Sequence, residues 1–195
     1  MSALWTSPTV TAWRAALERY PDVLAAQGVA RLPDLDAWYQ HELPPTLALR
    51  DPAHATLAEL VRLTEWKMAR GVWRGPNLAL VRSNAPDTVE STTRDALRGI
   101  PHPTAPVATL STLAGVGPAT ASALVAAAAP ALYPFFDELV AAQVPALGPV
   151  RWTLGYYRRY ADALRARADA LGDDWTPARV ERALWATAGG KAGAT

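Results

Sequence analysis

Residues 110–121 read Leu110-Ser111-Thr112-Leu113-Ala114-Gly115-Val116-Gly117-Pro118-Ala119-Thr120-Ala121. Apolar residues at helical spacing lie on both sides of the glycines, so the segment predicts two helices joined by a very short turn. Gly115 and Gly117 can adopt backbone conformations closed to other residues, and Val116 is expected to point inward and hold the turn. Pro118 suits the first turn of the second helix, where its missing N–H costs nothing. The stretch therefore predicts a helix-hairpin-helix whose backbone amides bind a phosphate.

Composition limits the classes of protein to consider. The chain has 195 residues, half of them apolar, which is enough for one sizeable core. A formal net charge of +1 provides no general attraction for nucleic acid, so any binding surface must be a local patch. The longest apolar run, residues 123–129, is too short to cross a bilayer, and no signal segment opens the chain. We therefore expect a cytoplasmic protein with no membrane partner.

Hydrophobic periodicity predicts an all-α, multi-helix globule, because apolar residues recur at three- and four-residue steps and no alternating β-branched runs occur. Ser7 and Pro8 predict the N-cap and first residue of an opening helix. Prolines are expected to separate the helices. The other helices are expected at residues 34–41, 55–70, 86–99, 106–113, 118–129, 137–143, 150–171 and 177–188. We expect one domain over residues 1–188, with one core or two lobes around a cleft, a hairpin at 106–129 and a disordered tail at 189–195.

The hairpin and the segment after it resemble the helix-hairpin-helix DNA glycosylases, the superfamily of endonuclease III and the alkyladenine glycosylases. An apolar helix and a proline-containing loop follow the hairpin, and Asp137 then opens the next helix, 22 residues after Gly115. In the family this order leads to the catalytic aspartate. The resemblance covers about residues 105–142. It implies a glycosylase-like fold with a cleft that receives a flipped nucleotide of duplex DNA, and a catalytic role for Asp137.

The chain also departs from the family. Ala119 lies two residues after the second hairpin glycine, where strand-cleaving members carry a Schiff-base lysine, so the resemblance implies a monofunctional enzyme. The iron–sulfur cluster of the endonuclease III branch is excluded because the chain has no cysteine. The segment 138–142 lacks the His and Arg often found after the catalytic aspartate. The resemblance implies no cofactor beyond a monovalent cation that hairpin carbonyls can hold.

No protein metal site is expected, because the histidines are isolated and lack metal-ligand spacing. They are His41, His54 and His102.

Asp137 has two interpretations. An Asp at the start of a helix is usually an N-cap that complements the helix dipole. Phe135 and Phe136 precede it, however, and could desolvate the carboxylate enough to make it a general base for water at neutral pH. The family position favours the catalytic interpretation, with Glu138 as the neighbour that could exchange roles with Asp137.

A second candidate segment is residues 65–74, at the end of the helix expected from residue 55. Trp66, Arg70, Trp73 and Arg74 could line a cleft in which aromatic rings stack on a base or sugar and arginines bind phosphate. The alternative is that this helix is buried on both sides and that Trp66 belongs to the core. With the hairpin, the expected nucleic-acid-binding residues are Gly115, Val116, Gly117, Ala119, Thr120, Trp66, Arg70, Trp73 and Arg74.

Lys67 is a further candidate for catalysis. Of the 19 basic residues, lysine supplies only Lys67 and Lys191. Lysine can lose its proton when buried and act as a base or a Schiff-base nucleophile. The alternative is a lysine whose stem covers the apolar side of its helix and whose ammonium group reaches solvent.

The sequence thus favours a DNA-binding protein that resembles a monofunctional DNA glycosylase, in which Asp137 activates water as the N-glycosidic bond breaks. One alternative is a non-catalytic helix-hairpin-helix module that binds nucleic acid. The other is a protein-interaction domain whose tryptophans form the partner surface.

Overall fold

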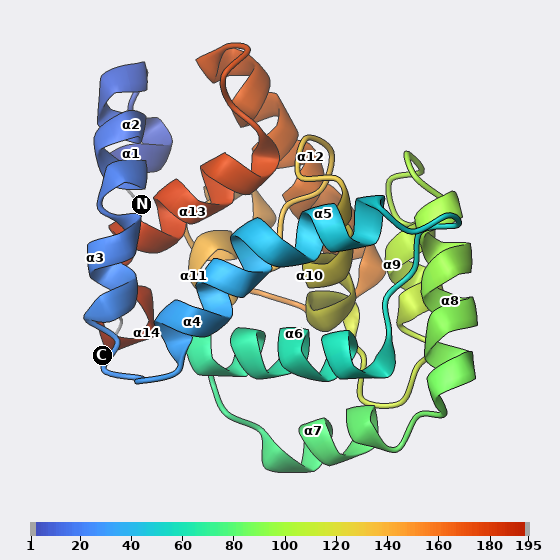
Figure 1. Ribbon diagram of the computed structural model, residues 1–195. Coiled ribbons are helices and arrows are strands. Elements are labelled where there is room, and N and C mark those ends of the chain that lie inside the picture. Colours follow the sequence, from blue (N-terminus) through green and yellow to red (C-terminus); the bar gives the residue numbers. More distant parts are fainter. Residues whose placement is uncertain (1–2, 194–195) are drawn as a thin grey trace.

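Every regular element in residues 3–193, the part described by the computed structural model, is helical (Figure 1). The all-α prediction is therefore confirmed. In chain order the elements are α1 (Ala3–Thr6), α2 (Val10–Glu18), α3 (Tyr20–Ala25), α4 (Leu32–Ala37), the π-helix η1 (Trp38–Glu42), α5 (Leu43–Ala48), α6 (Leu57–Arg70), α7 (Gly75–Arg82), α8 (Pro86–Arg98), α9 (Ala105–Leu110), α10 (Pro118–Ala128), α11 (Glu138–Ala141), the 3₁₀-helix η2 (Pro145–Leu147), α12 (Leu154–Leu171), α13 (Pro177–Thr187) and α14 (Gly190–Gly193).

Each expected helix is present, and most ends shift by a few residues. The largest difference at the start of the chain is in α2, which begins at Val10 with Thr9 as its N-cap, rather than at Pro8. The helix expected at 34–41 is divided into α4 and the π-helical turn η1. The tail expected to be disordered over 189–195 contains α14, and residues 194–195 lie outside the described part.

Prolines account for two helices that periodicity did not predict, α5 and α7. Pro44 and Pro45 lie in the first turn of α5, and Pro76 lies in the first turn of α7. In the first turn a backbone N–H has no intrahelical acceptor, so proline is tolerated there and its fixed φ favours the helix. These prolines lie at helix boundaries, as predicted, and they also begin two helices that the periodicity did not predict.

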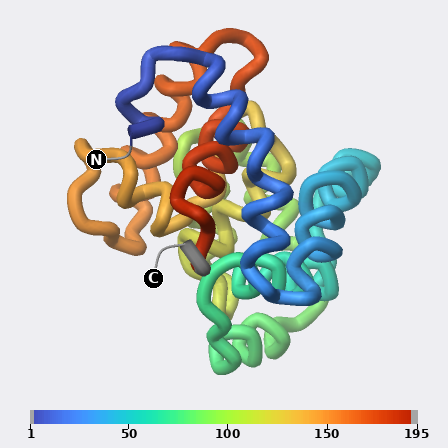
Figure 2. The backbone as a smooth tube through the Cα atoms, turned by 90° about the vertical axis from the view of Figure 1, so that its left-hand side faces the viewer, coloured from blue at the N-terminus to red at the C-terminus, as the bar shows by residue number. Residues whose placement is uncertain are grey.

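Two helices organise the packing. Helix α6 contacts α4, α7, α8 and α10, and in Figure 1 it crosses the lower middle of the molecule with α7 below it. Helix α13 contacts α2, α3, α11 and α12. The two ends of the chain are therefore packed together, and Figure 2 shows the blue N-terminal helices beside the red C-terminal ones.

The core is rich in large aromatic side chains. Trp13, Trp66 and Trp185 are fully buried, one each from α2, α6 and α13. The hydrophobic cluster to which they belong extends from Leu4 to Ala186. In the described residues, no helix combines the length and the apolar character that crossing a membrane requires.

Candidate functional site

The predicted turn is present: residues 111–117 join α9 to α10. Gly115 has φ +74°, a left-handed conformation that favours glycine. A Cβ atom at Gly115 would lie 2.7 Å from the Asn77 carbonyl oxygen and 2.8 Å from the Val81 nitrogen. The Asn77 Nδ2 donates a hydrogen bond of 2.8 Å to the Gly115 carbonyl. Gly115 thus allows the turn to pack directly on α7.

Asn84 holds the neighbouring residue of the turn. Its Oδ1 accepts from the Ala114 N–H at 2.9 Å, and its Nδ2 donates to the Ala114 carbonyl at 3.0 Å. These bonds satisfy both backbone polar groups of Ala114 from one amide side chain. The turn is therefore fixed by the two asparagines of α7 and its C-terminal loop.

Replacing Gly115 with alanine is expected to lower the free energy of unfolding by about 2–4 kcal/mol, from the positive φ and the overlap with α7 together. Gly117→Ala is the matched control. Gly117 has an extended backbone, φ −94° and ψ 178°, and its Cβ would meet no atom within 4 Å. The Gly117→Ala variant should lose less than about 1 kcal/mol of unfolding free energy, the range expected for a weakened N-cap. Urea denaturation of both variants measures the difference, and equal losses would contradict the packing argument.

The hairpin residues divide into two groups. Gly117, Ala119 and Thr120 line a surface hollow, whereas Gly115 and Val116 do not. Val116 is buried, as expected, and its N–H donates to the Leu113 carbonyl at 3.1 Å. That amide is already paired, so the prediction that Val116 offers its N–H to a ligand is corrected. The N-terminus of α10, from Gly117 onward, is the part of the hairpin that faces the hollow.

The hollow has a volume of about 220 Å³ and lies where four parts of the chain meet. The end of α6, the following loop and Asn77 of α7 form one side, and the start of α10 forms another. The segment before α11 and the residue two positions before α12 complete it. Its lining residues are Lys67, Gly71, Val72, Arg74, Asn77, Gly117, Pro118, Ala119, Thr120, Phe135, Phe136, Asp137, Glu138 and Trp152.

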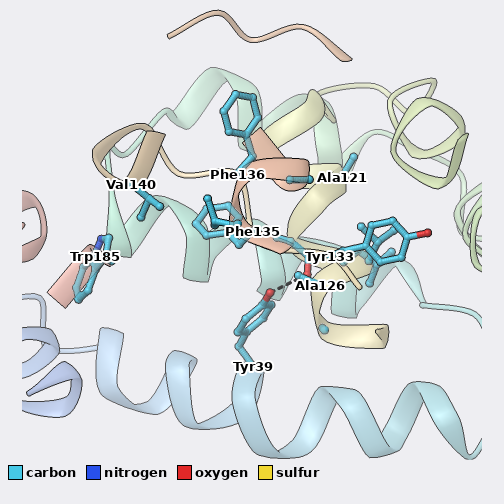
Figure 3. Packing of buried hydrophobic residues seen from close by; sticks show 14 of the residues in the cluster. Tyr39, Ala121, Ala126, Tyr133, Phe135, Phe136, Val140 and Trp185 are labelled. Atoms are coloured by element: carbon cyan, nitrogen blue, oxygen red, sulfur yellow. Dashed lines mark hydrogen bonds between the residues drawn. The ribbon is translucent and has the colours of Figure 1, made fainter. Parts of the chain in front are cut away.

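Asp137 reaches the hollow from a firmly held segment. The Phe136 N–H donates to the Ser122 Oγ of α10 at 2.9 Å, and the Tyr160 hydroxyl of α12 donates to the Phe135 carbonyl at 2.7 Å. Phe135 and Phe136 project from this segment in different directions (Figure 3), and both are buried. The backbone before Asp137 is thus fixed on both sides, which limits where its carboxylate can lie.

Asp137 is the N-cap of α11, so the capping interpretation is confirmed as a structural role. Its Oδ1 accepts from the backbone N–H groups of Leu139 at 2.8 Å and Val140 at 3.4 Å. Its Oδ2 lies 4.0 Å from the Nε of Arg70. Capping therefore occupies one carboxylate oxygen and leaves the other free of backbone donors.

Behind Asp137 lies a buried cluster of charges. Arg70, Glu181 and Asp137 are 1%, 2% and 8% exposed. The Arg70 guanidinium donates to the Glu181 carboxylate. Its Cζ also lies 4.5–5.7 Å from the ring centres of aromatic residues on four different elements or loops, a range typical of cation–π contact. These are Tyr20, Trp66, Phe135 and Trp185. One cation thus serves two buried carboxylates.

Asp137 and Glu181 share one buried cation, Arg70, and the burial of both carboxyls raises their pKa values. Burial raises the pKa of Asp137, and the Arg70 charge and the two backbone N–H donors act in the opposite direction. Burial also raises the pKa of Glu181 to about 7, against the lowering effect of Arg70. Both carboxyls therefore hold protons more strongly than an exposed acid does.

Lys67 faces the same hollow from α6. Partial burial lowers the pKa of Lys67, and the charge of Arg74 lowers it further. The carboxylates of Asp137 and Glu138 act against this lowering. The lysine and the aspartate that the sequence singled out for chemistry are therefore brought to one hollow.

Three candidates of the segment 65–74 lie away from the hollow. Trp66 is fully buried, stacks on Tyr39 with ring centres 3.6 Å apart and donates from Nε1 to Asp36 at 2.8 Å. The core interpretation of Trp66 is confirmed, and a stacking role for it is wrong. Arg70 is buried and paired with Glu181, so it cannot reach a phosphate at the surface, which corrects that prediction.

Trp73 is exposed and does not line the hollow, although its neighbours Val72 and Arg74 do.

The structure adds functional candidates that the sequence reasoning missed. Trp152 lines the hollow, is 46% exposed and packs on Phe136 with ring centres 4.8 Å apart. The sequence placed Trp152 inside the helix expected at residues 150–171, whereas α12 begins at Leu154 and leaves Trp152 in the loop before it. The sequence reasoning missed Glu181 because this glutamate lies among apolar residues on the side of α13 that packs into the core.

Comparison with protein-family models, with curated proteins and with solved structures finds no match. Residues 3–193 contain no group of three or more His, Cys, Asp or Glu side chains placed to hold a metal ion.

Proposed function

We propose that the chain is a DNA-binding protein of the helix-hairpin-helix glycosylase type, which hydrolyses the N-glycosidic bond of a damaged or modified base. The observation that carries the proposal is the shared hollow. The N-terminus of α10, Lys67 and Asp137 come from separate parts of the chain and line one cavity with Trp152. The reaction needs groups that bind phosphate, a carboxylate that acts on water, and an exposed aromatic ring that stacks on the base.

Each part has a role in binding. Amides at the N-terminus of α10 and the positive charges of Lys67 and Arg74 attract a phosphate of the DNA strand. The exposed ring of Trp152 offers a face on which an extruded base stacks. The binding charge is thus local, which agrees with a formal net charge of only +1.

Asp137 is the group that acts on water. Its Oδ1 is held by two backbone N–H groups, so Oδ2 receives the proton of an attacking water. The water oxygen bonds to C1′ of the sugar, the bond from C1′ to the base nitrogen breaks, and the base leaves with that electron pair. Burial raises the pKa of Asp137, which makes its carboxylate a better proton acceptor.

The rival function is a nucleic-acid-binding module without chemistry. The confirmed capping role of Asp137 favours it, because a cap explains an aspartate at this position without catalysis. Both functions predict binding to DNA, and only the first predicts release of a base.

The deciding experiment measures base release from duplexes that carry uracil, alkylated, oxidised or mismatched bases. Asp137→Asn is expected to lose at least about 100-fold in rate, the scale of a lost general base. Asparagine also caps helices well, so the variant keeps the Oδ1 hydrogen bonds and the fold. Salt-dependent binding of the same duplexes is measured in parallel.

Asp169→Asn in α12 is the matched control, because Asp169 is exposed and distant from the lining residues of the hollow. It should release base at the wild-type rate. Binding without release from any duplex would favour the module, and an active Asp137→Asn variant would remove Asp137 from the mechanism.

A further inference from the structure

We propose that a second cavity, separate from the hollow, binds a small organic cation whose ammonium group pairs with the Glu181 carboxylate. This cavity has a volume of about 240 Å³ and is lined mainly by residues of η1, α10 and α13. Of the described residues that line the two cavities, Phe135 alone lines both. The inference therefore concerns another site, and it holds whether or not the chain acts on DNA.

The cavity has a buried floor and an accessible rim. Arg70 and Glu181 are 1% and 2% exposed, and Phe135 beside them is buried as well. The rim residues are half-buried or exposed, and they are Gln40, His41, Pro44, Pro130, Ala178 and Arg182. A charged group that passes the rim leaves bulk water, so its pairing with a charge at the floor is stronger than at the surface.

Glu181 presents an unpaired carboxylate oxygen at this floor. Its Oε1 accepts from the Arg70 guanidinium, whereas its Oε2 accepts no hydrogen bond from residues 3–193. The side chain keeps 3% of its surface exposed, and the residue lines the cavity. A buried polar atom without a partner is costly, so a donor that reaches Oε2 is stabilising. The cavity is the side from which such a donor can come.

The buried charges favour a positive donor. One buried cation, Arg70, interacts with three buried carboxyls, those of Asp36, Asp137 and Glu181. Burial raises the pKa of Glu181 to about 7, so this acid is only partly ionised at neutral pH. An ammonium group at Oε2 supplies a second cation and favours the ionised carboxylate.

The walls suit the organic part of such a ligand. Tyr39 and Phe135 bring two aromatic rings to the cavity, and Ala126 and Ala127 of α10 add apolar surface. The Tyr39 hydroxyl donates to the Ala123 carbonyl at 2.8 Å, which fixes the ring against α10 (Figure 3). Aromatic rings attract cations and also pack on apolar carbon. A primary amine on a small apolar or aromatic body therefore matches both the floor and the walls.

Arg182 is the lining group that opposes a cation. It lies at the rim, and its Nη1 donates to the Gln40 Oε1 at 3.1 Å. Its side chain is only half-buried, so solvent weakens its field relative to that of Arg70. The other titratable groups around Glu181 are Tyr20, Tyr39, Tyr160 and His41. Burial raises the pKa of each of these tyrosines, so they stay neutral between pH 6 and pH 8.

The test compares three probes of similar shape and different charge: benzylamine, benzyl alcohol and benzoate. Isothermal titration calorimetry measures their binding to the full chain. At pH 8 we expect benzylamine to bind at least about tenfold more tightly than the other two, the scale of a hydrogen bond to a charged group. Benzoate that binds as tightly as benzylamine would show that the arginines govern the cavity, and it would overturn the inference.

The affinity for benzylamine should also depend on pH. The amine requires ionised Glu181, whose pKa of about 7 predicts a loss of about tenfold between pH 8 and pH 6. Protonation of His41 at the rim acts in the same direction. Glu181→Gln separates the two effects, because it leaves His41 in place and removes the carboxylate. This variant should bind benzylamine at least about tenfold more weakly at pH 8 and lose most of the pH dependence.

Two further variants locate the amine. Ala178→Leu on α13 fills part of the cavity and leaves Glu181 intact, so it should weaken binding several-fold, and it decides the matter should Glu181→Gln fail to fold. Glu138→Gln is the matched control, because Glu138 lines the hollow instead, and it should bind as wild type does. Binding that survives Glu181→Gln or Ala178→Leu, or is lost in Glu138→Gln, would place the amine elsewhere and overturn the inference, as would a wild-type protein that does not bind benzylamine.

Discussion

Replacing Arg70 with methionine is expected to lower the free energy of unfolding by about 3–5 kcal/mol, a large part of the stability of an ordinary domain. The loss arises because Glu181 and Asp137 remain buried without their shared cation. Contacts of the guanidinium with the surrounding aromatic rings are lost as well. Chemical denaturation at neutral pH, followed by circular dichroism, measures the change.

Arg98→Met is the matched control for Arg70. Arg98 pairs with Asp95 at 3.4 Å, and both side chains are about two-thirds exposed. An exposed pair contributes little, so this variant should change stability by less than about 1 kcal/mol. A double variant, Arg70→Met with Glu181→Leu, should regain stability over Arg70→Met alone, because an apolar pair replaces a broken ionic one. Equal effects of Arg70→Met and Arg98→Met would contradict the buried cluster.

The contrast between Arg70 and the hairpin shows what the sequence could predict. The turn between α9 and α10 follows from local chemistry: two glycines, a first-turn proline and flanking periodicity specify it within twelve residues. Arg70 was predicted to line a cleft and bind phosphate, whereas it is buried and paired with Glu181. Local sequence does not show which residues of a helix are covered by its neighbours, and α6 contacts four other helices while Arg62 of the same helix stays exposed.

The residues of the candidate site also fall into two groups, those found from local sequence and those found only in the folded structure. Asp137 and Lys67 were found because each is unusual in its local sequence, one after two phenylalanines and the other in a chain poor in lysine. Trp152 and Glu181 lie far from them in the sequence. Trp152 lines the hollow with them, and Glu181 of α13 pairs with Arg70 behind Asp137. No local pattern specifies such long-range contacts, so the sequence singled out two residues that line the hollow and missed the groups packed around them.

Glu181 makes the stability of the protein fall as pH rises from 5 to 8. Its pKa is raised from an ordinary value of 4.5 to about 7 by burial. Between these values the folded protein keeps a proton that the unfolded chain has lost. The free energy of unfolding therefore decreases by about 1.4 kcal/mol per pH unit, or roughly 3 kcal/mol in total. Below pH 4.5 this contribution is fully present, and above pH 7 it is lost.

Glu181→Gln isolates this effect, because glutamine cannot ionise and its Oε1 can still accept from Arg70. We expect the variant to lose less stability than wild type between pH 5 and pH 8, and to keep only the smaller slope from the raised pKa of Asp137. Glu18→Gln, at an exposed position of α2, should follow the wild-type curve. Urea midpoints at four pH values suffice for the comparison. A wild-type stability that rises over this range, with the same slope in Glu181→Gln, would show that Glu181 is ionised in the folded protein and that Arg70 fully compensates its burial.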